Sequence, residues 1–332
     1  MNITRRSFGV STSKDCSHGL EMLQHAGADF EVEKRQLKFD LMTDGIGTDA
    51  VYIDAYVPIR SDTQEALSNK TIGEGYQVLQ NREVIDVVDA ICAGHDLSYQ
   101  FMTQINGGAG MCVQIMSEDL NRALMIGKDE HQGRLTISNF HDGSGALRVH
   151  ISLLRMFCKN VFPALKREFR GAKDHASSYS IKHSKNMEER INSMIVCYRD
   201  AMGDLENTAR IMKLLSNKKC SDNEQKELFK RLMLADGKDE KDLSERAKGI
   251  RNNKYTELRK LANQNQNYCG DLQGTWYSAI QPITDYATHG IRVRDTGRVS
   301  ADESRFTSAH FGAGADFAQQ GIEIAMELAG VE

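Results

Sequence analysis

The sequence is poor in proline and contains no long apolar run. Only 3 of its 332 residues are proline, 40% are hydrophobic and 27% are charged, which is typical of a chain that folds around a core. Nowhere do about 18 apolar residues follow one another, so no transmembrane helix is expected. The length suggests one large domain or two modest ones.

The cysteines lack the spacing of a metal or redox site. All seven are scattered and none forms a CxxC pair. Their odd number and the lack of a recognisable signal peptide predict reduced thiols and a protein of the bacterial host cytoplasm. The histidines show no HExxH spacing, so we expect structural or surface histidines and no metal site.

Motifs for nucleotides and for catalysis are also missing. There is no GxxxxGK[ST] and no GxGxxG after a strand, which argues against ATP-driven activity and against any cofactor. Gly312-Ala313-Gly314 fits either an anion site or a tight turn. Cys158 with His141 or His150 fits either thiol catalysis or a buried small side chain. We therefore assign no catalytic residue and favour a protein that is not an enzyme.

Charge is distributed unevenly along the chain. The net charge is −4, yet residues 159–260 hold 24 Lys and Arg against 16 Asp and Glu, while the remainder holds 18 against 30. A basic middle in an acidic protein fits a polyanion partner, and it fits a solvated helical face equally well.

Alternating apolar residues predict a sheet in the first half of the chain. Two pairs of strands flank turn sequences rich in glycine, which is typical of antiparallel hairpins. A helix is expected over 82–92, after Asn81 as its cap. The strands are expected at 30–38, 50–59, 76–79, 97–106, 111–117, 134–140 and 146–151.

Helical spacing dominates the second half. We expect a helix over 152–170, kinked at Pro163, and a helix of roughly thirty residues from about 184. The narrow apolar stripe of the longer helix fits a coiled-coil seam or the face of an intramolecular bundle. Ser221-x-x-Glu224 is a capping box that opens a further helix. Helices over 272–289 and 313–328 flank an arginine-bearing loop at 290–308.

These elements predict an α+β fold, with an antiparallel β-meander packed against helices, a helical insertion and C-terminal helices. The predicted organisation is a flexible N-terminal arm at 1–26, a core domain at 27–175, the insertion at 176–265, and helices at 266–332 that pack back on the core.

Basic residues gather on the second hairpin and on the helix expected after it. Such a stripe would contact phosphates without reading sequence, and Tyr99, Phe101 and Phe140 would stack on bases or fill the core. Ordinary surface charge is the alternative. The candidate nucleic-acid contacts are Arg134, Arg148, Arg155, Lys159, Asn160, Lys166, Arg167 and Arg170.

Several short motifs occur in one order along residues 70–330. They are Tyr76–Glu83, His141–Val149, Arg155–Asn160, Thr275–Ala279, Thr284–His289 and Phe311–Gly314. Together they resemble the phage/plasmid-like family, a domain of unknown function found in many phages and plasmids. Lys159 stands where that family usually has Gln. The family has no established catalytic residues, so the resemblance implies none here.

The order of strands and helix is more loosely similar to the single-strand annealing proteins of phage recombination, of the Red beta and RecT type. That similarity implies an ATP-independent protein that binds and anneals single-stranded DNA as a homo-oligomeric ring or filament in recombination or replication. Host or phage replication proteins are further partners, and no membrane is. The alternative is a host-interaction or anti-defence protein that acts by binding another protein.

Overall fold

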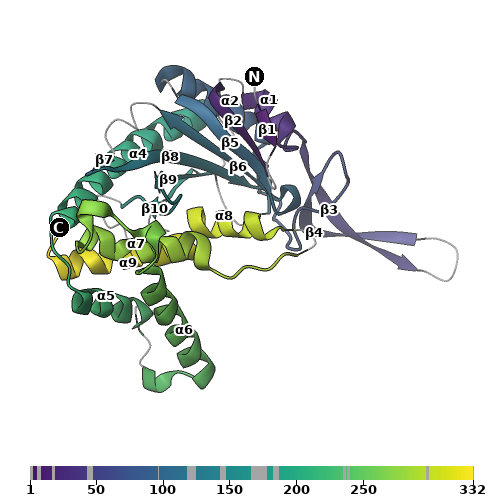
Figure 1. Ribbon diagram of the computed structural model, residues 1–332. Helices are drawn as coiled ribbons and strands as arrows, with labels where there is room; N and C mark the ends of the chain where they lie inside the picture. Colours follow the sequence, from purple (N-terminus) through teal and green to yellow (C-terminus); the bar gives the residue numbers. More distant parts are fainter. Residues whose placement is uncertain are drawn as a thin grey trace.

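The computed structural model describes residues 3–5, 9–16, 19–42, 48–95, 97–117, 125–142, 147–165, 178–181, 187–234, 237, 240–296 and 299–331. In these residues helices pack around an antiparallel sheet (Figure 1): α1 and α2 contact β5, α4 contacts β9, α8 contacts β9 and β10, and α7 and α9 pack beside β10. The fold is α+β, as predicted.

The main sheet has the strand order β1-β2-β5-β6-β8-β9-β10, with β11 paired to β9 and β7 paired to β8. Every pairing is antiparallel. Its strands are β1 (Ile3–Arg5), β2 (Val10–Cys16), β5 (Leu97–Ile105), β6 (Gly110–Ser117), β7 (Met125–Ile126), β8 (Asp129–Phe140), β9 (Leu147–Arg155), β10 (Val161–Pro163) and β11 (Ser178–Ile181).

Both predicted hairpins are confirmed, since β5 pairs with β6 and β8 pairs with β9. Val113 lies opposite Ile137, and Leu135 lies opposite Ile151, so apolar side chains line up across β6, β8 and β9. All four are at most 4% exposed. Because successive side chains of a strand point to opposite faces, this row fixes which face meets the apolar helices.

The helix predicted over 152–170 is wrong for residues 152–165, none of which is helical; residues 166–170 lie outside the described residues. Strand β9 continues to Arg155, a turn follows, and β10 begins at Val161. The turn is closed by two backbone bonds, from Lys159 N to Arg155 O (2.8 Å) and from Arg155 N to Asn160 O (3.0 Å). Pairing with β8 keeps the chain extended, because each residue of β9 gains ladder hydrogen bonds there.

The helices largely follow the predicted periodicity. Helix α4 has 30 residues, and its stripe packs inside the molecule, since Met194, Ala201 and Leu215 are at most 1% exposed. The helices are α1 (Gly19–His25), α2 (Asn81–His95), α4 (Met187–Ser216), α5 (Asp222–Leu234), α6 (Glu245–Leu261), α7 (Trp276–Asp285), α8 (Ala301–Phe311) and α9 (Ala313–Ala329).

Capping explains where the later helices begin. The predicted capping box is present: Ser221 N donates to Glu224 Oε2 (2.7 Å), and Glu224 N donates to Ser221 Oγ (3.3 Å).

Helices α7 and α9 pack closely, and a Cβ on Gly321 would lie 2.7 Å from Ile283. A larger residue than glycine would separate these two helices.

Three further segments differ from the sequence analysis. Residues 76–79 form no strand, and α8 occupies residues 301–311, most of it within the expected loop. Within the segment predicted as an N-terminal arm, β2 pairs with β5, and α1 buries Met22 and Leu23 completely. None of the described helices is both long and apolar enough to cross a bilayer.

A second, two-stranded sheet projects from the body as a ribbon (Figure 1). It consists of β3 (Val32–Met42) and β4 (Thr48–Arg60), the two strands predicted nearest the N-terminus. Its base is tied down by Gln80, whose side chain accepts from Val32 N (2.9 Å) and donates to Val32 O (3.0 Å). We call this element the β3–β4 arm.

Candidate functional site

The structure places two of the predicted DNA contacts in the interior. Arg155 is 1% exposed and Asn160 is fully buried. Neither side chain is on the surface, because the segment is a strand and a turn and not a cationic helix. These two residues are therefore part of the interior, and the prediction that they lie on a cationic surface stripe is wrong.

The other predicted contacts are dispersed. Arg134 on β8 and Arg148 on β9 are half-buried on one face of the sheet, and Lys159 is exposed in the turn between β9 and β10. Lys166, Arg167 and Arg170 lie outside the described residues.

Arg155 is the centre of a buried polar cluster that joins distant parts of the sequence. Its guanidinium lies 2.7 Å from Asp129 Oδ2, and the hydroxyl of Tyr277 donates to the same oxygen (2.9 Å). The Tyr277 hydroxyl also lies 3.1 Å from Nε2 of His131. We define the buried polar cluster as Asp129, His131, Arg155, Asn160, Asn267, Tyr277, Thr284 and Asp285.

The cluster is charged but compensated. Burial is the largest influence on the pKa of Arg155 and acts to lower it, but the hydrogen bond to Asp129 and the electrostatic interactions with Cys269, Tyr277 and Asp129 together outweigh burial, so the pKa lies above its ordinary value. Burial, followed by the charge of Asp129, raises the pKa of Tyr277 well above its ordinary value. Arg155 is therefore cationic and Tyr277 neutral, and the carboxylate has two donors.

Amide side chains extend the cluster toward α7. Asn160 Nδ2 lies 3.5 Å from both Asn267 Oδ1 and Thr284 Oγ1, and Asn267 Nδ2 donates to Asp285 Oδ2 (2.7 Å). The turn is held from the same side, since Val161 N donates to Thr288 Oγ1 (3.0 Å). These bonds fix the β9–β10 turn against α7, which is a structural role.

Two thiols border the guanidinium but are poor nucleophiles. Cys158 Sγ and Cys269 Sγ each lie 3.6 Å from a nitrogen of Arg155. Burial raises the pKa of the Cys269 thiol to about 12, and it also raises the pKa of Cys158. Both thiols are thus protonated near neutral pH, so the arrangement does not support thiol catalysis. Among the described residues no group of three or more His, Cys, Asp or Glu is placed to hold a metal ion.

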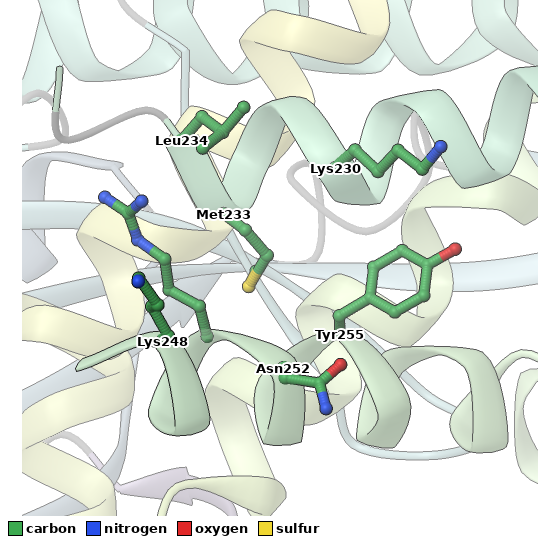
Figure 2. Close-up of a pocket in the computed structure, with 7 residues that line it drawn as sticks. Lys230, Met233, Leu234, Lys248, Asn252 and Tyr255 are labelled. Carbon is green, nitrogen blue, oxygen red and sulfur yellow. The ribbon is translucent and has the colours of Figure 1, made fainter. Parts of the chain in front are cut away.

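A cationic groove lies between α5 and α6, within the basic middle of the chain. It has a volume of about 380 Å³. Figure 2 shows Met233 between the two helices, with Lys230 and Tyr255 on one side and Lys248 on the other. The groove is lined by Lys230, Met233, Leu234, Lys248, Arg251, Asn252 and Tyr255.

The lining combines three cations with an apolar floor and includes no carboxylate. Lys230 and Leu234 are exposed, and Tyr255 is half-buried. Glu245 lies 2.8 Å from the ammonium of Lys248, and Arg251 also has a partner within the protein. Such a groove attracts anions and offers an aromatic ring for stacking.

Sequence reasoning missed this groove, although a signal for it was present. Lys248, Arg251, Asn252 and Tyr255 follow i, i+3, i+4, i+7 spacing, which places them on one side of a helix. The excess of basic residues over 159–260 pointed to the same segment, but the expected helix over 152–170 drew the assignment elsewhere.

The family model described as a domain of unknown function (DUF932) matches residues 69–310. That range includes the sheet from β5 onward, the buried polar cluster, the cationic groove and nearly all of α8. No curated protein and no solved structure matches the chain.

Proposed function

Since the chain belongs to the DUF932 family, whose function is unknown, we propose a function from its own surface: a phage- or plasmid-encoded protein that binds and anneals single-stranded DNA as a multimer without ATP. The observation that carries the proposal is the cationic groove, with three cations, one tyrosine and no carboxylate in its lining. The short sequence motifs described above support a phage or plasmid source.

The physical basis is the structure of the ligand. A single strand offers a phosphate charge at every nucleotide and a flat base beside it. Lys230 and Arg251 would meet phosphates, and the ring of Tyr255 would stack on a base. Binding of this kind tolerates many sequences, as annealing requires, because every base has a stacking face.

The test is binding of a short fluorescein-labelled oligo(dT) at low and moderate salt, with the complex sized by light scattering. We expect salt-sensitive binding by a multimer. The double variant Lys230→Glu/Arg251→Glu should weaken binding by about tenfold or more. The slope of log affinity against log salt concentration should become shallower by about one for each cation lost, because each cation accounts for about one phosphate contact.

A matched control is available on α5 and α6. Lys260 is 65% exposed and lies outside the groove lining. Combined with Lys226→Glu on α5, which is 41% exposed and also outside the lining, Lys260→Glu makes the same charge change in the same two helices, so this double variant should leave affinity close to that of the wild type. Equal loss in both variants, or none in the groove variant, would remove the groove from the proposal.

The β3–β4 arm favours a second candidate function, binding to another protein. Phe39 is 60% exposed and lies opposite Val51, which is 45% exposed. The register of the two strands is irregular between Gln36 and Lys38, and beyond this point Arg35 lies opposite Val57. Exposed apolar surface of this extent is typical of an interaction site. An isolated two-stranded ribbon is also only marginally stable in water.

The arm does not suit a polyanion, because β3 and β4 together carry four basic and four acidic residues. It would serve multimer assembly in the first candidate, or capture of a host protein in the second. Phe39→Ser distinguishes these uses. Loss of the multimer with loss of annealing would support assembly, whereas an unchanged multimer that no longer forms a stoichiometric complex with a host protein would support the second candidate.

A further inference from the structure

The face of the main sheet that is turned toward α8 is unusually polar for a covered surface. Gln114 lies opposite Thr136, and Thr136 lies opposite His150, so one row across three strands is polar. Thr136 is fully buried, His150 is 2% exposed and Gln114 is 7% exposed. We call this face the α8-facing sheet surface and define it as Phe101, Gln114, Arg134, Thr136, Ser138, Phe140, Arg148, His150 and Ser152.

Register places two cations and two aromatic rings on this surface. Arg148 lies opposite Ser138, and Arg134 lies opposite Ser152. Both arginines are half-buried. The rings are Phe101 on β5 and Phe140 on β8. At this level of the sheet the opposite face of the same strands carries Val113, Leu135, Ile137 and Ile151 and is apolar; that face becomes polar only toward the end of β8 and β9 that holds the buried polar cluster.

Helix α8 covers this surface mainly with rings. Phe306 lies 5.3 Å from Phe101, and Phe311 lies 5.1 Å from His150 and 6.2 Å from Phe140, measured between ring centroids. His310 adds one polar contact, with its Nε2 3.4 Å from Nε2 of Gln114. Each aromatic group of the sheet surface therefore meets an aromatic ring of α8.

Helix α8 covers this surface incompletely, and some buried polar atoms at the contact lack a hydrogen-bond partner. Phe306, His310 and Phe311 are all only half-buried. Ser152 is 4% exposed, and its Oγ has no hydrogen-bond partner among the described residues, nor has Nδ1 of His310. A buried polar atom left unpaired in this way is uncommon in native packing and calls for an explanation.

We propose that the α8-facing sheet surface is a second binding surface for a single-stranded polynucleotide, and that Phe306 and Phe311 occupy the positions of stacked bases until the strand displaces α8. This inference rests on the proposed function. Phe101, Phe140 and His150 offer stacking faces on adjacent strands, Arg134 and Arg148 reach phosphates, and the row from Gln114 to His150 offers donors and acceptors to base edges.

Helix α8 is held by a hydrogen bond at each end, which its displacement would break. Its first turn is held by Glu303, whose carboxylate accepts from Asn106 N in the turn between β5 and β6. Its last turn is joined to α9 through Gly312, and Gly314 N donates to Ser308 Oγ (3.1 Å) at that corner. The ring contacts and the His310–Gln114 pair join α8 to the sheet, and α8 also packs on α9 and on residues 286–290.

The experiment uses the wild-type protein and the variant Phe306→Ala/Phe311→Ala, with a short fluorescein-labelled oligo(dT) as the probe. Removing the two rings raises the open fraction, so affinity should increase by about tenfold. Adding Arg148→Glu to the variant should abolish the gain. Phe317→Ala is the control for loss of an aromatic ring elsewhere, because this α9 ring contacts Tyr286 and Lys254.

Hydrogen exchange of the wild-type protein provides a second readout that needs no variant. Saturating oligo(dT) should speed exchange of the amides of residues 303–311, since α8 leaves the sheet. Unchanged or slower exchange there would overturn the inference, as would equal affinity of the wild type and the α8 variant. If the wild type binds through the groove but the α8 variant gains nothing, only this inference fails; if neither protein binds, the proposed function fails as well.

Discussion

The guanidinium of Arg155 lies 2.7 Å from the carboxylate of Asp129, and only 1% of the Arg155 side chain is exposed. Asp129 opens β8 and Arg155 closes β9, so the pair ties the two strands together at one end of their ladder. Tyr277 brings α7 to the same carboxylate. An arginine that sequence reasoning assigned to DNA thus holds the sheet to the C-terminal helices.

Asp129→Asn should destabilise the protein strongly. The substitution leaves the Arg155 charge buried without its counter-ion, and breaking a buried pair in this way costs about 3–5 kcal/mol. Urea unfolding followed by circular dichroism measures the change. Asp302→Asn, in an exposed pair with Arg305, is the control and should change stability by less than about 0.5 kcal/mol. Similar small losses in both variants would contradict a stabilising role for the Arg155 pair.

Lys159→Gly should stabilise the protein. Lys159 has a φ of 61°, in the left-handed region, where a side chain costs roughly 1 kcal/mol that glycine avoids. We expect a gain of up to about 1 kcal/mol in the free energy of unfolding, reduced by the greater freedom of glycine in the unfolded chain. Because Lys159 is exposed, the same variant also tests its predicted DNA contact: weaker oligo(dT) binding with greater stability would separate the two roles.

His310 should make stability fall in mild acid. Burial, assisted by the charge of Arg134, lowers the pKa of His310 to about 4 from an ordinary value near 6.5. Between these values the unfolded chain binds the proton and the folded protein does not, so stability is complete above about pH 6.5 and decreases as the pH falls. The loss approaches about 3 kcal/mol at about pH 4.

The measurement is urea unfolding of the wild type and His310→Gln at about pH 7.5 and about pH 5, where the wild type should lose about 2 kcal/mol more than the variant. Glu303 acts in the opposite direction, because burial raises its pKa and protonation in acid relieves that cost. It is common to both proteins and cancels in the difference. Parallel pH profiles would show that His310 titrates normally in the folded protein.

Thr275→Ala should remove the N-cap of α7. The Thr275 hydroxyl accepts from Ser278 N (3.3 Å) and donates to Leu272 O (2.6 Å), and the residue is 4% exposed. Loss of such a cap costs about 1–2 kcal/mol. Thr275→Ser keeps the oxygen and should cost much less. If the serine variant is as unstable as the alanine variant, the lost methyl group and not the cap explains the effect.

Local pattern was sufficient for much of the fold. Alternation of apolar residues around Val113 and Ile137 predicted the hairpins, and the helical spacing of apolar residues from Met187 to Leu215 predicted α4. In both cases the spacing of the apolar residues indicates a single buried face. Helix α8 escaped detection for the same reason: it buries little beyond Glu303 and Ala309, so its sequence has no clear apolar stripe.

The candidate site depended on contacts that no local pattern contains. Leu153, Leu154 and Phe157 fit helical spacing, but the ladder with β8 holds β9 extended through Arg155. Whether a basic residue is buried depends on partners far along the chain, as Asp129 and Tyr277 show for Arg155. The intrinsic helix propensity of a short segment is too weak to outweigh such tertiary contacts.

The strand order has a consequence for how the chain folds. The strands from β5 through β6, β8 and β9 to β10 follow one another in sequence, so each pairing closes only a short loop. Strand β2 pairs with β5 across α1, the whole β3–β4 arm and α2. Closing that long loop lowers the conformational entropy of the chain before the stabilising contacts between β2 and β5 have formed. We expect β5 to β10 to nucleate folding, with β2 joining last, and in a chevron analysis substitutions in β2 should speed unfolding while leaving the folding rate unchanged.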